Sequence, residues 1–317
     1  MELREIGRTG VSVTPLMFGT SGLGRLPDTK AGEHRARATL EAIFESPVNC
    51  LDTSNNYGMG RSEMRIGEAI RAEGGLSDGF VISTKLDRDM ETDRLDGDQA
   101  WRSIETSLRR LGVDQVGCLH LHDPEHCADL GEIIGKGGAL EALFRMKEQG
   151  LARAVGLAMG RLDMMSLILK DWPFDALINH NRWTLLNRTA CDLFDDAFAR
   201  GVVVLNAAPF AGGVLAKGAD AMPVISYSPA DDAALAPVRT IEALAARHNV
   251  APGAAALQFS TADPRISSTI VGVSRPESVQ QMLDWANQRI PDALKTRLAE
   301  LPADTGDPEA HRVFDFK

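Results

Sequence analysis

The chain has 317 residues, of which 44% are hydrophobic and 25% charged, and these ordinary globular values exclude a disordered, collagen-like or coiled-coil chain. Asp and Glu number 44 against 34 Lys and Arg, which gives a formal net charge of −10 and removes the electrostatic case for general nucleic-acid binding. The four cysteines form no C-x-x-C pair, so neither a disulfide framework nor a zinc ribbon is expected.

The chain begins with two short β-rich segments, Glu2–Ile6 and Ser12–Thr14, separated by Gly7-Arg8-Thr9-Gly10. This arrangement predicts a small N-terminal hairpin. Apolar runs typical of buried parallel strands follow it. They are Leu16–Thr20, Val48–Thr53, Phe80–Lys85, Val116–His122, Ala154–Ala158, Asp175–Asn179, Val202–Ala207 and Ser268–Val271.

Segments with helical periodicity lie between these runs and after the last one. In chain order they are His34–Glu45, Ser62–Ala72, Asp98–Leu111, Leu140–Gln149, Leu162–Lys170, Ala190–Arg200, Pro237–His248 and Ser278–Asn287. Ser62 is placed to cap the second helix. The polar, proline-containing stretch Ala219–Asp232 indicates a long loop after the seventh strand.

Eight strands, each followed by a helix, are typical of a (β/α)8 TIM barrel. This is the fold class that we predict, with the β-hairpin added at the N-terminus and one domain over residues 1–317. A doubly wound sheet shows the same alternation and stays the alternative from counting alone. In a barrel the active site lies at the C-terminal ends of the strands, so polar residues there are candidates for function.

Three consecutive predicted strands end with ionisable residues, Asp52, Lys85 and His122, and Tyr57 lies in the loop after Asp52. A tyrosine with its free pKa of about 10 is a poor acid–base group near neutrality unless a cation favours the phenolate. Lys85 can supply that cation, Asp52 can keep the lysine charged, and His122 can orient a substrate oxygen. Such a set can move a proton at a carbonyl or hydroxyl oxygen while a nicotinamide cofactor exchanges hydride with carbon.

Several segments carry a resemblance to one family. The run DTSNNYGMGRSEMRIGEA at residues 52–69 resembles the aldo-keto reductase signature, and STKL at residues 83–86 resembles its lysine motif. SLRRLGVDQVGCLHLHDPE at residues 107–125 resembles the segment that leads to the family's histidine. Residues 3–20, 208–216 and 271–282 extend the similarity over nearly the whole chain.

The resemblance implies a (β/α)8 barrel with NAD or NADP across its C-terminal mouth. It implies that Tyr57 is the acid–base residue, supported by Asp52, Lys85 and His122, and that Tyr57 and His122 contact the substrate. Cofactor contacts are expected from Gly19, Thr20, Asp52, Ala208, Pro209, Phe210, Gly212, Gly213, Leu215, Gly272, Ser274, Arg275, Ser278 and Gln281.

Within the family, the segments SNNYG, HLHDPE, RWTLL and NAAPFAGG look most like the aldose 1-dehydrogenase branch. That branch includes L-fucose dehydrogenase, D-threo-aldose 1-dehydrogenase and relatives of pyridoxal 4-dehydrogenase. The resemblance implies a small sugar, aldehyde or alcohol substrate, with oxidation of an aldose at C1 to the lactone. Oxidation of pyridoxal and a general aldehyde or ketone reduction at the same site are the alternatives.

Two positions depart from the family pattern. Ala158-Met159 stands where many members carry a Ser-Asn pair that holds the cofactor carboxamide. Ala207 stands where an aromatic residue often stacks on the nicotinamide. Trp183 or Phe210 is the candidate for replacement aromatic surface, and Trp183 is also a candidate substrate contact.

The cofactor preference is expected to lean toward NAD. Gly272 and Ser278 stand where NADP-preferring members commonly carry Lys and Arg, so Arg275 is the nearby cation that remains. The 2′-phosphate of NADP is bound well by cationic side chains, above all by a bidentate Arg.

Two functions from other classes stay open at this point. His120, His122, His126 and Cys127 include a His-x-His pattern and residue types that suit zinc, which makes a metal-dependent barrel hydrolase one alternative. The later strand ends offer few further ligands, so no metal is expected. A cofactor-binding subunit without catalysis is the other alternative, although binding alone does not require a complete tetrad.

The first residues lack the apolar stretch of a secretory signal, and no apolar run approaches the roughly 18 residues of a membrane helix. We therefore expect a cytoplasmic protein with neither a membrane nor a nucleic-acid partner, for which a homodimer is one compatible assembly. Cys50 and Cys118 fall within predicted strands and are expected in the core.

Overall fold

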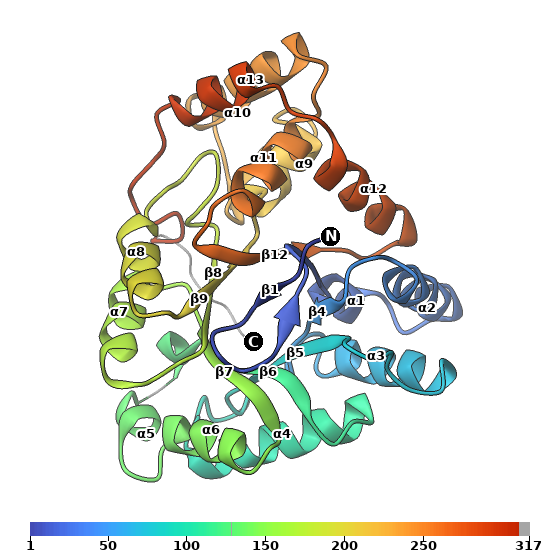
Figure 1. Ribbon diagram of the computed structural model, residues 1–317, viewed down its shortest axis with the longest axis vertical. Coiled ribbons are helices and arrows are strands. Elements are labelled where there is room, and N and C mark those ends of the chain that lie inside the picture. Colours follow the sequence, from blue (N-terminus) through green and yellow to red (C-terminus); the bar gives the residue numbers. More distant parts are fainter. Residues whose placement is uncertain (128, 311–317) are drawn as a thin grey trace.

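A computed structural model of the protein describes residues 1–127 and 129–310. Parallel strands close into a barrel that is surrounded by helices (Figure 1). The ring consists of β3 (Leu16–Gly19), β4 (Cys50–Asp52), β5 (Val81–Leu86), β6 (Val116–His122), β7 (Ala152–Ala158), β8 (Ala176–His180), β9 (Val203–Ala207) and β12 (Ile266–Gly272). β12 pairs with both β9 and β3 and so closes the ring. The predicted barrel is confirmed, and the doubly wound alternative is wrong.

The predicted N-terminal hairpin is present as β1 (Arg4–Glu5) and β2 (Ser12–Val13), which pair antiparallel. Figure 1 shows it lying across one mouth of the barrel. Hydrogen bonds hold it at the N-terminal ends of the strands: Arg153 donates to Gly10 O over 2.7 Å, and Asn49 donates to Ser12 O over 2.8 Å. Because this mouth is covered, the opposite mouth is the one available for a site.

The predicted helices are all present with shifted ends. They are α2 (Lys30–Phe44), α3 (Arg61–Ala72), α4 (Gly97–Leu111), α6 (Ala139–Glu148), α7 (Leu162–Asp171), α8 (Cys191–Ala199), α10 (Asp232–Arg247) and α12 (Pro276–Asn287). The largest shift is at α10, where the Asp231 side chain accepts from Ala234 N and caps the helix, so that Pro237 lies inside it.

Other elements have no counterpart in the sequence-based prediction. The short ones are α1 (Ser21–Arg25), α5 (Gly131–Ile134), α9 (Val214–Lys217) and the 3-10 turns η1 (Pro124–His126) and η2 (Ala211–Gly213), and the longer ones are α11 (Pro252–Thr261) and α13 (Asp292–Ala299). α11 buries Gly253, Ala254, Ala255, Ala256 and Leu257 in succession. A helix buried on most sides lacks the alternation of apolar and polar faces on which the prediction relies.

The stretch predicted as one long loop, residues 219–232, contains a second small hairpin. Its strands are β10 (Val224–Ile225) and β11 (Ser228–Pro229), and they pair antiparallel. Ser226 and Tyr227 form the turn between them, both with positive φ. None of the helices in the described part of the chain is long and apolar enough to span a bilayer.

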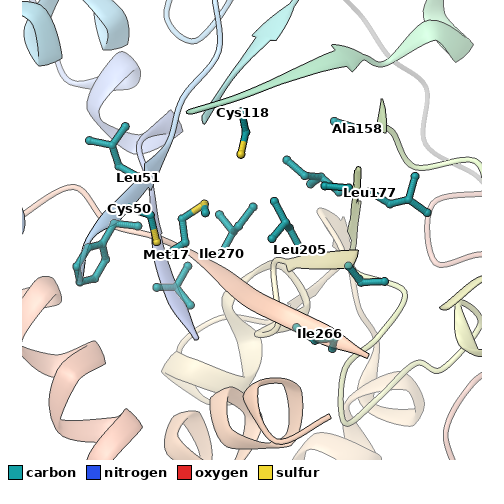
Figure 2. Close-up of a cluster of buried hydrophobic side chains, with 14 of the residues drawn as sticks. Met17, Cys50, Leu51, Cys118, Ala158, Leu177, Leu205, Ile266 and Ile270 are labelled. Atoms are coloured by element: carbon teal, nitrogen blue, oxygen red, sulfur yellow. The ribbon is translucent and has the colours of Figure 1, made fainter. Parts of the chain in front are cut away.

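The barrel interior contains an apolar layer beneath the C-terminal mouth. Figure 2 shows Met17, Cys50, Cys118 and Ile270 lying together inside the ring of strands, and all four are buried. Burial raises the pKa of the Cys50 thiol to about 12, which keeps it neutral. The expectation that Cys50 and Cys118 are core residues is confirmed. This layer supports the polar residues that follow it along the strands.

Candidate active site

A cavity of about 480 Å³ opens at the C-terminal ends of the barrel strands. Asp52, Lys85 and His122, from β4, β5 and β6, line it together with Tyr57 from the loop after β4. The four residues predicted to be catalytic therefore share one cavity, although 70 positions of sequence separate Asp52 from His122.

Lys85 and Asp52 form a buried ion pair. Lys85 Nζ donates to Asp52 Oδ1 over 2.8 Å, to Oδ2 over 2.7 Å and to Thr53 O over 2.5 Å. The two residues are 2% and 3% exposed. The lysine ammonium group therefore donates its hydrogen bonds to Asp52 and Thr53, and the Asp52 carboxylate balances its positive charge.

Tyr57 lies beside this pair. Its ring centroid is 5.0 Å from Lys85 Nζ, and the ring meets that of His122 edge to face at 6.2 Å. Burial raises the pKa of the Tyr57 phenol well above 10, and the negative charges of Asp52 and Asp123 raise it further. This direction is opposite to the lowered pKa that we expected beside Lys85, because burial and the carboxylates dominate. The raised pKa keeps the phenol protonated near neutral pH.

The Tyr57 loop is placed by a close backbone contact with α1. A Cβ at Gly24 would lie 2.7 Å from Tyr57 O, and a Cβ at Gly58 would lie 2.1 Å from Gly24 O. Gly58 also has a φ of 63°, which a residue with a side chain adopts only with strain. The Tyr-Gly pair of the signature therefore combines the predicted acid–base residue with the glycine that lets its loop pack.

The Ser-Glu pair of the signature is structural. Ser62 does not cap α3 as predicted, because the helix begins one residue earlier, after Gly60. Ser62 Oγ is instead buried and donates toward Thr20, while Glu63 accepts from Thr84 Oγ1 over 2.7 Å and from Arg110 over 3.3 Å. These bonds fix the start of α3 against β3 and β5.

His122 is held by a carboxylate that the sequence reasoning missed. Its Nδ1 lies 2.6 Å from Asp87 Oδ1, and its Nε2 lies 3.6 Å from Asp123 Oδ2. Burial lowers the pKa of His122, but the two carboxylates outweigh this effect and raise it above its usual 6.5. Asp87 directly follows β5 and lies two positions after Lys85. Polar residues at strand ends are candidates for function, and this criterion, which selects Lys85, applies to Asp87 as well.

Several residues predicted to bind the cofactor border the cavity. Gly19, Asp52, Ala208 and Gly272 line it. A Cβ at Gly272 would meet nothing within 4 Å, so the cavity is open on the side of β12. From there Ser274, Arg275, Ser278 and Gln281 continue to and along α12 at exposed or half-buried positions. The cofactor-binding role expected for these four exposed or half-buried positions stays a prediction.

Other predicted cofactor residues turn their side chains inward. Thr20 is buried and its hydroxyl donates to Asp52 O over 2.9 Å. Phe210 packs edge to face on Trp285 at 5.7 Å, and Pro209 and Leu215 are buried. In the same segment Gly212 and Gly213 are half-buried with φ of 79° and 112°. These buried side chains are engaged in the protein interior. The cofactor-binding role expected for their segments stays a prediction.

Trp183 does not lie in the cavity. It is 8% exposed and stacks on Phe259 at 5.7 Å, with the Arg265 guanidinium 4.4 Å from its ring. Its predicted roles as substrate contact and aromatic surface are therefore not supported, and neither is the second role for Phe210. The aromatic residue that does line the cavity besides Tyr57 is Tyr227, which is 47% exposed on the turn between β10 and β11.

The metal-hydrolase alternative gains no support. Across residues 1–127 and 129–310 no three His, Cys, Asp or Glu side chains converge on a common point. His120 is buried under the cavity, where its Nδ1 lies 3.4 Å from Ser83 Oγ. Burial lowers the pKa of His120 to about 3, so the ring is neutral. His126 lines a different cavity, together with Arg161 and Arg182.

Comparisons with known proteins agree with the geometry. Residues 15–301 match the model of the aldo/keto reductase family. L-galactose dehydrogenase from Arabidopsis thaliana is 30% identical, with 89% of this chain and 86% of that protein covered. Pyridoxal 4-dehydrogenase from Microbacterium luteolum is 28% identical over 94% and 96% of the two chains. D-threo-aldose 1-dehydrogenase from a Pseudomonas species is 28% identical over 92% and 94%.

Among solved structures, the holo form of an aldo-keto reductase from Bacillus halodurans superposes with a TM-score of 0.79. The superposition covers 99% of this chain and 100% of the other at 20% identity, which supports the barrel fold. The family match spans most of the chain and includes all four residues gathered in the cavity. The chain belongs to the aldo/keto reductase family of NAD(P)-dependent oxidoreductases.

Proposed function

We propose that the protein oxidises an aldose, or a closely related polyhydroxylated small molecule, with Tyr57 as the acid–base residue. The observation that carries this proposal is the single cavity in which Tyr57 lies between the buried Lys85–Asp52 pair and His122. When bound, the nicotinamide cofactor accepts or supplies a hydride at the substrate carbon. The residues of this chain handle the proton.

The proton chemistry follows from the environment of Tyr57. In the oxidative direction the ionised phenol takes the proton of the substrate hydroxyl, and in the reductive direction the neutral phenol returns it to the carbonyl oxygen. Lys85 and Asp52 lie next to the phenol as a balanced pair and hold the floor of the site rigid. His122 lines the same cavity, where its ring can bind the substrate oxygen.

The substrate class is supported by the polar groups at the rim. Arg25, Asp123 and His180 line the cavity beside the tetrad. They supply donors and acceptors of hydrogen bonds, which is what a sugar with several hydroxyls requires. The names of the relatives point the same way, since two of the three refer to sugars. Pyridoxal, named for the third relative, is the second candidate.

For the cofactor we propose a lean toward NAD. Arg275 is the cation at the start of α12, and its Nε already donates to Ser278 Oγ over 3.1 Å. Gly272 and Ser278 offer no charge to a 2′-phosphate. Losing a charge-assisted hydrogen bond costs about 1.5–3 kcal/mol, so the absence of cations at positions 272 and 278 removes most of the preference for the phosphate.

The test is absorbance of the reduced nicotinamide while aldoses, pyridoxal and simple aldehydes are offered with each cofactor. Turnover of an aldose with retention of activity after exhaustive chelation supports the proposal. Turnover of pyridoxal alone would select the second candidate. Activity that is lost on chelation and restored by zinc would support the hydrolase class, and no turnover of any substrate would support a non-catalytic role.

A further inference from the structure

Asp87 is a buried carboxylate at the edge of the site with no role in the tetrad described so far. It is 4% exposed and directly follows β5. Its backbone is fixed on both sides, since Asp87 N donates to Ser103 Oγ over 3.1 Å and Gln99 donates to Asp87 O over 3.1 Å. A carboxylate this rigid and this buried must be satisfied by specific partners.

The two carboxylate oxygens serve two different structures. Oδ1 lies 2.6 Å from His122 Nδ1. Oδ2 accepts from Ser54 Oγ over 2.6 Å and from Asn56 N over 3.1 Å, both in the loop that carries Tyr57. One side chain therefore joins the histidine at the end of β6 to the loop of the acid–base tyrosine.

The chemistry of this contact determines which nitrogen carries a proton. Burial raises the pKa of Asp87, but His122 and the Ser54 hydroxyl outweigh this and lower it below its usual 3.8, so the group is an ionised acceptor. An ionised carboxylate accepts and cannot donate, so His122 Nδ1 must carry the hydrogen. The other ring nitrogen, Nε2, then remains on the side of Asp123, which lines the reaction cavity.

We propose that Asp87 is a positioning residue that fixes the ring of His122, with Nδ1–H bound to the carboxylate and Nε2 turned to the cavity. By binding Ser54 and Asn56 at the same time, it also sets the distance between that ring and Tyr57. The part of this inference that concerns turnover rests on the proposed function. The part that concerns the histidine does not.

The charges around His122 favour its protonated form. Asp87 after β5 and Asp123 after β6 are anionic neighbours, whereas Lys85 opposes a second positive charge. Tyr57 and His120, two titratable rings nearby, are neutral, and His180 and Tyr227 line the same cavity. With two carboxylates against one lysine that is itself paired with Asp52, the balance keeps a positive Nε2–H donor available for a substrate oxygen.

Asp87→Asn changes this arrangement without changing its shape. The amide oxygen has to occupy the Oδ2 position to keep the bonds from Ser54 and Asn56, so the amide nitrogen then faces His122 Nδ1. Nδ1 must become an acceptor, which leaves a neutral ring with its proton on Nε2. Such a change of tautomer is known to be costly in a histidine–aspartate pair.

The primary experiment is an NMR titration of His122 in the full-length wild type and in Asp87→Asn, with His122→Gln to assign the signal. We expect the His122 titration in Asp87→Asn to move down by at least about one pH unit, and we expect the single proton of the neutral ring to sit on Nε2 in place of Nδ1. Asp89→Asn is the matched control, because Asp89 follows the same strand and accepts from the backbone of Glu91 and Thr92. An unchanged His122 titration in Asp87→Asn overturns the proposal.

Turnover separates positioning of the histidine from support of the loop. We expect Asp87→Asn to lower kcat at least about 10-fold in the wild-type background and less than about 3-fold in His122→Gln. Equal losses of kcat in both backgrounds would show that Asp87 acts through the Tyr57 loop alone and would overturn the proposal. A loss of kcat in Ser54→Ala as large as that in Asp87→Asn would overturn it as well. If the wild type turns over none of the substrates, the proposed function fails while the NMR result still decides the role of Asp87.

Discussion

Lys85 Nζ lies 2.8 Å and 2.7 Å from the two carboxylate oxygens of Asp52 and meets the Tyr57 ring only at 5.0 Å from its centroid. The lysine is therefore committed to the aspartate more than to the tyrosine. This relationship changes the expected role of the pair, because burial and the nearby carboxylates raise the pKa of the Tyr57 phenol despite the lysine. It makes the pair a buried structural element on which the site depends.

Lys85→Met is expected to destabilise the fold. The substitution leaves the Asp52 carboxylate buried without its cation, and breaking a buried pair in this way costs about 3–5 kcal/mol. Asp52→Asn combined with Lys85→Met removes the orphaned charge and is expected to recover more than half of that loss. The free energy of unfolding from urea denaturation measures both, and a double variant no more stable than Lys85→Met would contradict the prediction.

Tyr57→Phe is expected to lower turnover by at least about 10², the scale of general acid–base catalysis, since it removes the phenolic proton and keeps the ring. Cofactor affinity, measured by fluorescence titration, should stay within about twofold because the ring still fills the same space. Turnover within threefold of the wild type would reject Tyr57 as the acid–base residue.

The rate of oxidation is expected to rise with pH. Burial raises the pKa of Tyr57 well above 10, so only a small fraction of the phenol is ionised near neutrality. Because oxidation needs the ionised form, kcat should grow about tenfold per pH unit while the pH lies below that pKa and proton transfer limits the rate. Reduction needs the neutral phenol and should show no such rise. An oxidation rate that is flat across alkaline pH would contradict this assignment.

NAD is expected to be used at least as well as NADP, as judged by kcat/KM with one substrate. The reason is that Arg275, already bound to Ser278, is the single cation among the described positions 272–281. Because its Nε is already bound to Ser278, Arg275 is expected to give a 2′-phosphate less than one full charge-assisted bond, so Arg275→Ala should change the ratio of the two cofactors by less than about tenfold. A preference for NADP above tenfold that Arg275→Ala abolishes would show that this one arginine suffices for the phosphate.

Gly156→Ala is expected to destabilise the barrel. A Cβ at this position in β7 would lie 2.3 Å from His120 Cδ2 and 2.6 Å from Ala176 O, and the carbonyl belongs to the backbone of β8. Overpacking of this kind costs about 1–3 kcal/mol. Gly272→Ala is the matched control, since a Cβ there meets nothing within 4 Å and should cost less than about 0.5 kcal/mol. Thermal unfolding of the two variants makes the comparison, and equal stabilities would refute it.

The barrel and the members of the tetrad are predictable from the amino-acid sequence. Apolar runs at regular intervals are a local signal, and the C-terminal ends of parallel strands always meet at one mouth, so the sequence is enough to place Asp52, Lys85 and His122 together. Tyr57 follows from the adjacent motif. The interior cysteines are predictable for the same reason, because their position within a buried strand is visible along the chain.

How these residues interact depends on the folded chain. The register of β5 and β6 pairs Leu86 with Leu121, and this places Asp87 beside His122. The amino-acid sequence of neither segment indicates this contact. Trp183 stacks on Phe259 outside the cavity, whereas Tyr227 lines the cavity. Both positions likewise depend on how distant segments pack. Charge balance, tautomer and side-chain direction are set by neighbours that are remote in sequence, because closing the barrel is what brings them within hydrogen-bonding distance.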